Sequence, residues 1–131
     1  MPVRTAAQYM DSLKDDRSIY IEGERIKDVT KDNRFVGAAE TMGELLQMQH
    51  EKDLKEVLTY NSPTSGEKVG MSHIQPKSKD DIKARGDAMK VWMDATCGML
   101  GRSPDYKNVM VSAWAAAAKS FERETFDGSA N

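Results

Sequence analysis

The chain has 131 residues, two histidines, a single cysteine and a formal net charge of −2. A nearly balanced chain lacks the basic patch that nucleic-acid binding requires, and a lone cysteine excludes an intrachain disulfide. No apolar run reaches the length of a membrane span, and the first residues lack the order of a secretory signal, so we expect a cytoplasmic protein without a nucleic-acid or membrane partner.

The first part of the chain predicts two helices with a hairpin between them. Thr5 and Gln8 have the spacing of a capping box, which favours a helix beginning directly after the threonine. The β-favouring residues and central turn of segment 18–26 predict a small β-hairpin. Apolar residues at helical spacing predict a second helix over about 35–50, with its N-cap at 32–33.

The middle of the chain predicts a second hairpin and a long helix. Turn residues are dense over 60–66, and a return strand is expected at 68–71. Ser78 with Asp81 is another capping signature, which begins the long helix. We expect one side of that helix to carry Ile82, Met89, Trp92, Met93 and Thr96.

A last helix is expected after Ser103 as N-cap and Pro104 in the first turn. It presents a largely apolar row made of Tyr106, Val109, Met110, Ala113, Trp114, Ala117 and Phe121. Leu, Ile, Val and Phe together make up only about 17% of the chain. The predicted fold class is therefore mainly α with one or two small β-hairpins, around a thin core that a neighbour would complete.

The segment that can carry chemistry is Gly98–Tyr106, in which two glycines lead into the last helix. Arg102 brings a permanent charge and a planar fork that binds oxyanions or stacks on rings, and Tyr106 brings a hydroxyl. Together they could hold an aromatic ring and a phenolate at the start of a helix. The plainer alternative is that Arg102 pairs with Asp105 or Asp94 and that Tyr106 is a core residue.

The remaining reactive side chains predict no site of their own. His50 and His73 stand far from a second functional group in the sequence, so we expect both at the surface. Cys97 has no evident basic partner and is expected to be a small buried residue. None of the three has the spacing of a metal ligand set, so no metal is predicted.

Two motifs carry a resemblance to a known family. The segments Gly98–Tyr106 (Gly-Met-Leu-Gly-Arg-Ser-Pro-Asp-Tyr) and Leu58–Glu67 (Leu-Thr-Tyr-Asn-Ser-Pro-Thr-Ser-Gly-Glu) resemble the oxygenase component of 4-hydroxyphenylacetate 3-monooxygenase. The likeness extends from residue 4 to about 121 and corresponds to the N-terminal part of a family member. Further matching positions in family order are Arg4-Thr5, Tyr9, Ser12-Leu13, Arg17, Tyr20-Ile21, Gly23-Glu24-Arg25, Asp28-Val29-Thr30, Met89 and Trp92.

The resemblance implies a fold similar to the N-terminal helical region of an acyl-CoA dehydrogenase, and a phenol hydroxylase that works through a flavin hydroperoxide. It implies reduced FAD supplied by a partner flavin reductase, a phenolic substrate similar to 4-hydroxyphenylacetate, hydroxylation ortho to its hydroxyl, and a homotetramer. Arg102 and Tyr106 match the arginine and tyrosine that line the family's phenol site, so both become candidate catalytic and substrate-binding residues. Arg102 would stabilise the phenolate, and Tyr106 would hydrogen-bond the substrate or the peroxide oxygen.

The same resemblance implies that the flavin-contacting segments and the catalytic histidine of the family lie beyond Asn131. We therefore interpret residues 1–131 as a single N-terminal helical domain or fragment with a disordered tail at 127–131, inactive alone and without tightly bound FAD. Whether the chain is itself an enzyme is left open. The alternative is a non-catalytic helical module that oligomerises or binds a partner chain. A stand-alone enzyme has the least support, because no paired acid–base constellation is present.

Overall fold

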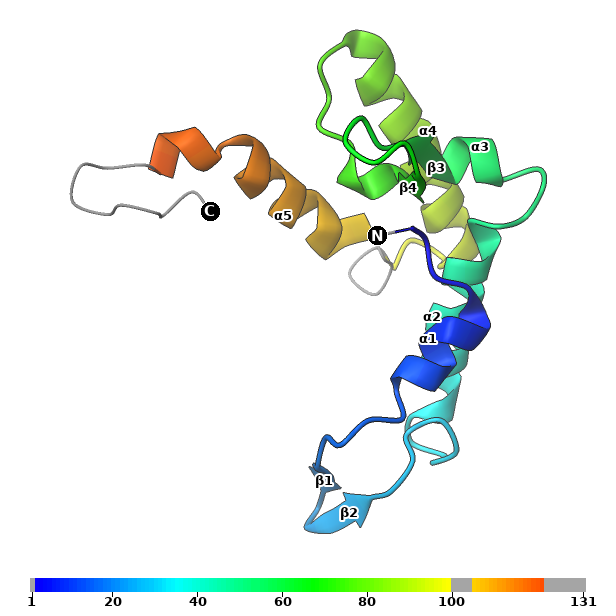
Figure 1. Cartoon of the computed structure of the whole chain (residues 1–131). Coiled ribbons are helices and arrows are strands. Elements are labelled where there is room, and N and C mark those ends of the chain that lie inside the picture. Colours follow the sequence, from blue (N-terminus) through cyan, green and yellow to red (C-terminus); the bar gives the residue numbers. More distant parts are fainter. Residues whose placement is uncertain (1, 100–104, 122–131) are drawn as a thin grey trace.

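The computed structural model describes residues 2–99 and 105–121 and confirms a mainly helical chain with two small antiparallel sheets. Its elements, with two short 3-10 helices named η, are α1 (Ala6–Ser12), β1 (Ile19–Ile21), β2 (Glu24–Ile26), α2 (Val36–Met48), α3 (Lys55–Leu58), β3 (Thr59–Asn61), β4 (Lys68–Gly70), η1 (Met71–His73), α4 (Lys79–Ala95), α5 (Asp105–Ala116) and η3 (Ala118–Phe121). Figure 1 shows an elongated arrangement, with the β1–β2 hairpin at one end, α3, β3, β4 and α4 at the other, and α5 projecting sideways.

The predicted capping boxes are confirmed at the starts of α1 and α4. The Thr5 hydroxyl accepts from the backbone N–H of Gln8 at 3.2 Å, and the Gln8 side chain accepts from the N–H of Thr5 at 2.9 Å. Ser78 and Asp81 exchange the corresponding bonds at 3.1 and 2.9 Å. Because both boxes satisfy backbone donors that a helix start leaves unpaired, local sequence is sufficient to place these two helix starts.

Helix α1 packs along α2 at a position where each helix has a small residue. A Cβ added to Gly43 would stand 3.6 Å from the Cβ of Ala6, so the two helices already approach to van der Waals distance at this position. The backbone N–H of Ala6 also donates to Oε1 of Gln47 at 3.2 Å. No residue of α1 is buried, and the helix therefore depends on this contact more than on a core of its own.

The predicted first hairpin is confirmed, with Ile19 opposite Ile26 and Tyr20 opposite Arg25. Its two-residue turn has φ of 51° at Glu22 and 82° at Gly23, the left-handed pair that suits the twist of a tight hairpin. The second hairpin is also confirmed, with Thr59 opposite Gly70 and β4 ending one residue short of the predicted strand.

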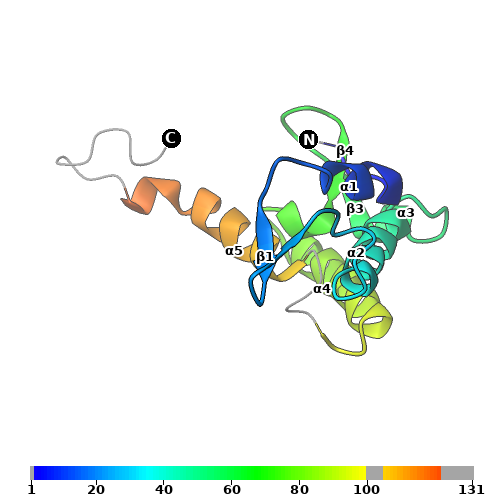
Figure 2. The same ribbon diagram turned by 90° about the horizontal axis from the view of Figure 1, so that it is seen from below.

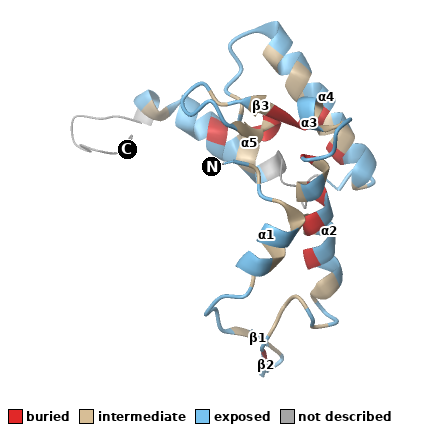
Figure 3. Cartoon of the chain, turned by 45° about the vertical axis from the view of Figure 1, so that its right-hand side comes forward, coloured by how far each residue is buried: buried red, intermediate tan, exposed pale blue. Residues whose placement is uncertain are grey.

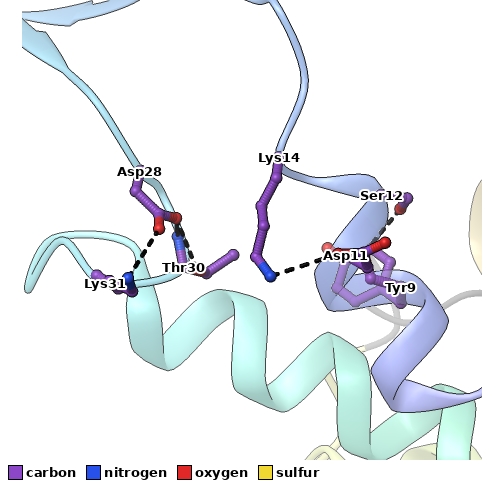
Figure 4. Close-up of polar contacts among 7 residues, drawn as sticks. All are labelled: Tyr9, Asp11, Ser12, Lys14, Asp28, Thr30 and Lys31. Atoms are coloured by element: carbon purple, nitrogen blue, oxygen red, sulfur yellow. Dashed lines mark hydrogen bonds and ion pairs between the residues drawn. The ribbon is translucent and has the colours of Figure 1, made fainter.

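The loop between β2 and α2 is held by two aspartates. Figure 4 shows Asp28 next to Thr30, whose backbone N–H and hydroxyl donate to it at 2.9 and 2.6 Å. These hydrogen bonds lower the pKa of the Asp28 carboxyl. Asp32 binds the guanidinium of Arg34 at 2.9 and 2.8 Å, and Arg34 reaches Glu24 of β2 at 3.1 Å. The loop is thereby tied to both the hairpin and the start of α2.

The predicted N-cap of α2 at 32–33 is wrong. The helix begins at Val36, and its N-cap Phe35 makes no side-chain cap hydrogen bond. Asp32 instead uses its carboxylate on Arg34, while its backbone carbonyl accepts from Phe35 and Val36 at 2.9 Å each. Because the carboxylate of Asp32 is already paired with the guanidinium of Arg34, it is not available as a side-chain cap for the helix.

The core is small and lies where α2, α3, η1 and α4 meet. Figure 3 shows the buried residues along α2 and around the junction of α3, β3 and α4. Among the described residues, Leu58 and Trp92 are the largest side chains that are fully enclosed, at 0% and 2% exposure. The buried cluster is made of Leu45, Leu58, Met71, Ala88 and Trp92. The expectation of a thin core agrees with this arrangement.

The predicted apolar side of α4 is partly wrong. Trp92 is buried as expected, but Ile82 is 62% exposed and Met93 is 41% exposed. The side that packs on the core instead carries Ala88 with Trp92, flanked by Ala84 and Val91. The core side of α4, which contacts α3 and η1, thus includes small alanines, and a spacing rule that favours large apolar residues overlooks them. Among the described residues, no helix combines the length and apolarity needed to cross a bilayer.

We expect Leu58→Ala to lower the free energy of unfolding by about 2–5 kcal/mol, because it leaves a cavity beside Trp92 in a core with few other large side chains. Urea unfolding of the chain measures this. The matched control is Ile82→Ala, which removes an aliphatic side chain of similar size from an exposed site and should change stability by less than about 0.5 kcal/mol. Equal losses in the two variants would contradict the assigned core.

The Asp32–Arg34 pair predicts a pH effect. The Arg34 side chain and backbone N–H lower the pKa of the Asp32 carboxyl from 3.8 to about 2. Because the folded-state pKa lies below the unfolded value, the contribution of the pair to stability is present above about pH 4 and is lost as the pH falls towards 2. NMR titration should show that Arg34→Gln returns the Asp32 pKa towards its ordinary value. The pKa of Asp81, lowered by the backbone of Lys77 and by Ser78, should stay low in the same variant.

Candidate functional site

The segment with the predicted site residues is only partly described. Gly98 and Met99 are described, and the chain resumes at Asp105 in the first turn of α5. Arg102 lies outside the described residues, and the description of Tyr106 covers its backbone in α5 but not its side chain. The pairing of Arg102 with Tyr106, like Ser103 and Pro104 as the start of the last helix, therefore stays a prediction.

The end of α4 sets where this segment begins. Thr96 is the C-cap, and its hydroxyl donates back to the carbonyl of Trp92 at 2.7 Å. Gly98 has φ of 82°, and its N–H donates to the carbonyl of Met93 at 2.8 Å. A left-handed residue directly after the C-cap, here Cys97 with φ of 51°, followed by an N–H that reaches back to the last turn, is a common way to stop a helix and satisfy its final carbonyls. The chain therefore leaves α4 in a defined direction, anchored to the turn that holds Trp92.

The expectation that Cys97 is buried is wrong. Cys97 is exposed and has φ of 51°, a left-handed conformation that is uncommon for a residue with a side chain. It lies directly after the C-cap of α4, at the residue where the backbone leaves the helix. His50 and His73, in contrast, are exposed as predicted.

Helix α5 is seated on η1 by a polar contact. The side-chain amide of Asn108 donates to the hydroxyl of Ser72 at 3.4 Å, and both residues are at least partly buried. Ser112, one turn further along α5, is also buried at 9% exposure. Because Met71 of η1 belongs to the core, this contact links the first half of α5 to the core through one neighbouring residue.

A polar groove of about 210 Å³ opens beside this contact. Its lining includes Gln49 at the end of α2, Ser72 of η1 and Asn108 of α5, together with Arg4 near the N-terminus. Gln49 is only 5% exposed, and a Cβ on Gly70 would come within 2.9 Å of its Oε1. Asn108 stands two residues after Tyr106, so the groove lies close to the predicted site residue in the chain. Sequence reasoning missed Gln49 and Ser72, because neither has a motif around it.

A second cleft of about 420 Å³ lies on the other side of η1, between the β3–β4 turn and the segment leading to α4. Tyr60 lines it and donates its hydroxyl to the carbonyl of His73 at 3.2 Å, and burial raises the pKa of the Tyr60 phenol. His73 borders both this cleft and the polar groove. The motif at 58–67 thus forms a cleft wall near the seat of α5.

The clefts described here do not match the demands of FAD. The cleft of about 420 Å³ is lined by one lysine, Lys77, and one aspartate, Asp81, so it has no excess positive charge for a pyrophosphate. A cleft of about 530 Å³ between α2 and the end of α4 is lined by Ala38, Thr41, Met42, Leu45, Thr96 and Met99, without a charged side chain. Within residues 2–99 and 105–121, no three His, Cys, Asp or Glu side chains are grouped to hold a metal ion. The residues of these two clefts could border a ring-shaped ligand, but they supply no net positive charge for a pyrophosphate.

Comparison with known proteins finds a family model and several relatives that match nearly the whole chain. Residues 5–131 match the family model described as 4-hydroxyphenylacetate 3-hydroxylase N terminal. The 4-hydroxyphenylacetate 3-monooxygenase oxygenase component of Thermus thermophilus is 44% identical over 119 residues, which cover 90% of this chain and 24% of the relative. The corresponding protein of a Geobacillus species is 41% identical over 125 residues, covering 95% of this chain and 25% of the relative.

The structure agrees with the sequence match. A crystal structure of the oxygenase component of 4-hydroxyphenylacetate 3-monooxygenase, complexed with FAD and 4-hydroxyphenylacetate, superposes with a TM-score of 0.84 at 43% identity. The match covers 92% of this chain and 25% of that protein. The described elements therefore have the arrangement of the matched part of that protein. The chain spans about a quarter of the length of the relatives it matches.

We expect alanine substitutions at Gly98, just after α4, and at Gly86, inside α4, to change the free energy of unfolding in opposite directions. Gly98→Ala should lower the free energy of unfolding by about 1 kcal/mol, because alanine is strained at a φ of 82°. Gly86→Ala, in the interior of α4 with no atom within 4 Å of the added Cβ, should raise it by about 0.5–1 kcal/mol through helix propensity. Thermal unfolding of both variants measures this. A stabilised Gly98→Ala would show that the turn after α4 is not left-handed.

Proposed function

The chain belongs to the 4-hydroxyphenylacetate 3-hydroxylase N-terminal family, and from that premise we propose that it is the N-terminal portion of a two-component monooxygenase. This enzyme uses reduced FAD from a partner reductase to hydroxylate a phenol similar to 4-hydroxyphenylacetate ortho to its hydroxyl. The match over residues 5–131 carries the proposal. The relatives are about four times as long, and we assign to the 131 residues the role of one helical domain that is inactive alone.

In this proposal Arg102 and Tyr106 bind the phenol. A guanidinium next to the phenol oxygen favours its ionised form, and a phenolate pushes electron density into the ring at the ortho carbon. Tyr106, at the start of α5, adds a hydroxyl that hydrogen-bonds the substrate. Support comes from the family motif at 98–106 and from the defined exit of the chain at Gly98, which precedes Arg102 by four positions.

The flavin is assigned to the rest of the enzyme. The cleft of about 420 Å³ pairs its one lysine with an aspartate, and the cleft of about 530 Å³ has no charged side chain, so we assign the pyrophosphate to residues outside this chain. The contribution of this chain is then to bind and orient the phenol. A tetrameric assembly belongs to the same proposal by analogy with the family.

A non-catalytic helical interaction module remains the second candidate. One observation favours it: Met110, Val111 and Trp114 of α5 are 40–59% exposed, as expected for a surface that binds another protein. This reading predicts that Arg102 has no effect on phenol binding.

We expect a chimera, in which this chain replaces the matched N-terminal quarter of the Thermus thermophilus relative, to hydroxylate 4-hydroxyphenylacetate when reduced FAD is supplied. Arg102→Ala should lower kcat/KM by about 10²–10³-fold, because the charge that stabilises the phenolate is lost. Tyr106→Phe should have a smaller effect. The 131-residue chain without the rest of the relative should show no turnover.

The matched control is Lys107→Ala, which removes an exposed positive charge next to Tyr106 in the sequence and should leave kcat/KM unchanged. Absorbance of a bound nitrophenol gives a second readout, because it reports ionisation directly: the probe should bind as the phenolate only when Arg102 is present. A folded chimera that binds and hydroxylates no phenol would overturn the proposal in favour of the interaction module.

A further inference from the structure

The short helix η1 lies between the two sequence motifs that carry the family likeness. It contacts α5, the helix that contains Tyr106, and it follows directly after β4, the strand that pairs with β3 in the hairpin of the motif at 58–67. Figures 1 and 2 show, in two perpendicular views, that α5 projects from the other helices and lies near them at its N-terminal end. The backbone position of Tyr106 therefore depends on how firmly η1 is held.

Three contacts hold η1 in the body. Gly70, its N-cap, lies against the end of α2, because an added Cβ would stand 2.9 Å from Oε1 of Gln49. Met71 belongs to the buried core cluster. At the far end of η1, the hydroxyl of Tyr60 donates to the backbone carbonyl of His73 at 3.2 Å. The third of these contacts comes from the motif at 58–67.

The hydrogen bond of Tyr60 adds an attachment that the hairpin alone does not provide. In the strand register Tyr60 is opposite Val69, and its hydroxyl reaches four residues further along the chain, to His73. The Tyr60 side chain packs against the core cluster. Burial raises the pKa of its phenol, so the hydroxyl stays protonated and remains a donor. The far end of η1 is thereby joined to β3 as well as to the chain that follows it.

Ser72 stands between Met71 and His73 and holds α5. It is buried, and its hydroxyl accepts the hydrogen bond from the side-chain amide of Asn108 at 3.4 Å. Asn108 follows Tyr106 by two residues in the same helix. A continuous path of contacts thus runs from the hydroxyl of Tyr60 through η1 to the start of α5.

We propose that Tyr60 is a positioning residue for the phenol site: its hydrogen bond to η1 keeps Ser72 in place under Asn108 and so fixes the start of α5, which carries Tyr106. This gives a role to the motif at 58–67, which supplies no residue to the proposed phenol site itself. The inference rests on the proposed function, because the helix start that it fixes carries the residue assigned to bind the phenol. Small displacements of a binding group are costly, since the reacting atoms must stay in a narrow range of geometries.

Hydrogen exchange in the 131-residue chain tests the contact path without a phenol. Tyr60→Phe removes one hydroxyl and keeps the ring, and Tyr20→Phe makes the same change at a tyrosine of β1 that is 61% exposed. The backbone amides at 109–112 of α5 should exchange at least about threefold faster in Tyr60→Phe than in the unchanged chain, because a weaker seat lets the helix open more often. Amides at 42–46 of α2 serve as the reference and should not change. Equal exchange at 109–112 in the two tyrosine variants would overturn the proposal, and so would equal acceleration in α2 and α5.

The chimera with the Thermus thermophilus relative tests the consequence for the phenol. Tyr60→Phe and Asn108→Ala should each lower kcat/KM by about tenfold, and the double variant should also lose about tenfold, because both changes interrupt one path. Tyr20→Phe should leave kcat/KM unchanged. In both single variants a smaller fraction of bound nitrophenol should be ionised at a given pH, a readout that loss of overall stability alone does not change.

Two outcomes in the chimera would overturn the inference while leaving the proposed function intact. One is a Tyr60→Phe variant as active as Tyr20→Phe while Arg102→Ala lowers kcat/KM. The other is a double variant that loses about a hundredfold, since multiplied effects mean that Tyr60 and Asn108 act independently. A chimera that binds no phenol defeats the proposed function and with it the phenol role of Tyr60, and the exchange at 109–112 then decides by itself whether Tyr60 holds α5.

Discussion

The packing of Trp92 and Leu58 is the interaction on which the rest of the structure depends. These two side chains are the only fully enclosed large residues among those described, and they join α3 to α4. Leu45 of α2 and Met71 of η1 belong to the same buried cluster, so four elements meet there. The elements away from the cluster are attached elsewhere: α1 packs on α2 where Ala6 meets Gly43 and donates to Gln47, and α5 packs on η1 beside the hydrogen bond from Asn108 to Ser72. A body built this way is ordered at its centre and incomplete at its edges.

This organisation connects the core to the predicted site. Trp92 fixes the last turn of α4, the hydroxyl of Thr96 returns to its carbonyl, and Gly98 closes that turn four residues before Arg102. On the C-terminal side of the segment, Met71 fixes η1, and the Ser72 hydroxyl accepts a hydrogen bond from Asn108, which follows Tyr106 by two residues. The two ends of the segment that carries Arg102 are thus each attached to the same core. For the proposed role of Arg102, this attachment fixes the described residues that flank it in the chain, and a fixed approach from both sides suits the positioning of a phenolate partner.

What could be predicted from the sequence is the local part of the fold. Both capping boxes and both hairpins were predictable, because the interacting groups lie within a few residues of each other and the tight turn suits Gly23. The N-cap of α2 was not, since Asp32 has a competing partner in Arg34. The buried side of α4 and the exposure of Cys97 depend on which elements cross α4 and on where its last turn ends. Those are tertiary facts that spacing rules do not contain.

The same distinction applies to the site. Family motifs pointed to Arg102 and Tyr106, but Gln49, Ser72 and Asn108 come together from three elements without a motif, and only the fold reveals their groove. Helix α5 shows the same dependence on the fold: Asn108 and Ser112 meet the body, whereas Met110 and Trp114 are 40% and 59% exposed. Spacing predicts an apolar row on this helix, but it does not say which members of the row the small body can bury, and that body leaves both of these side chains largely uncovered.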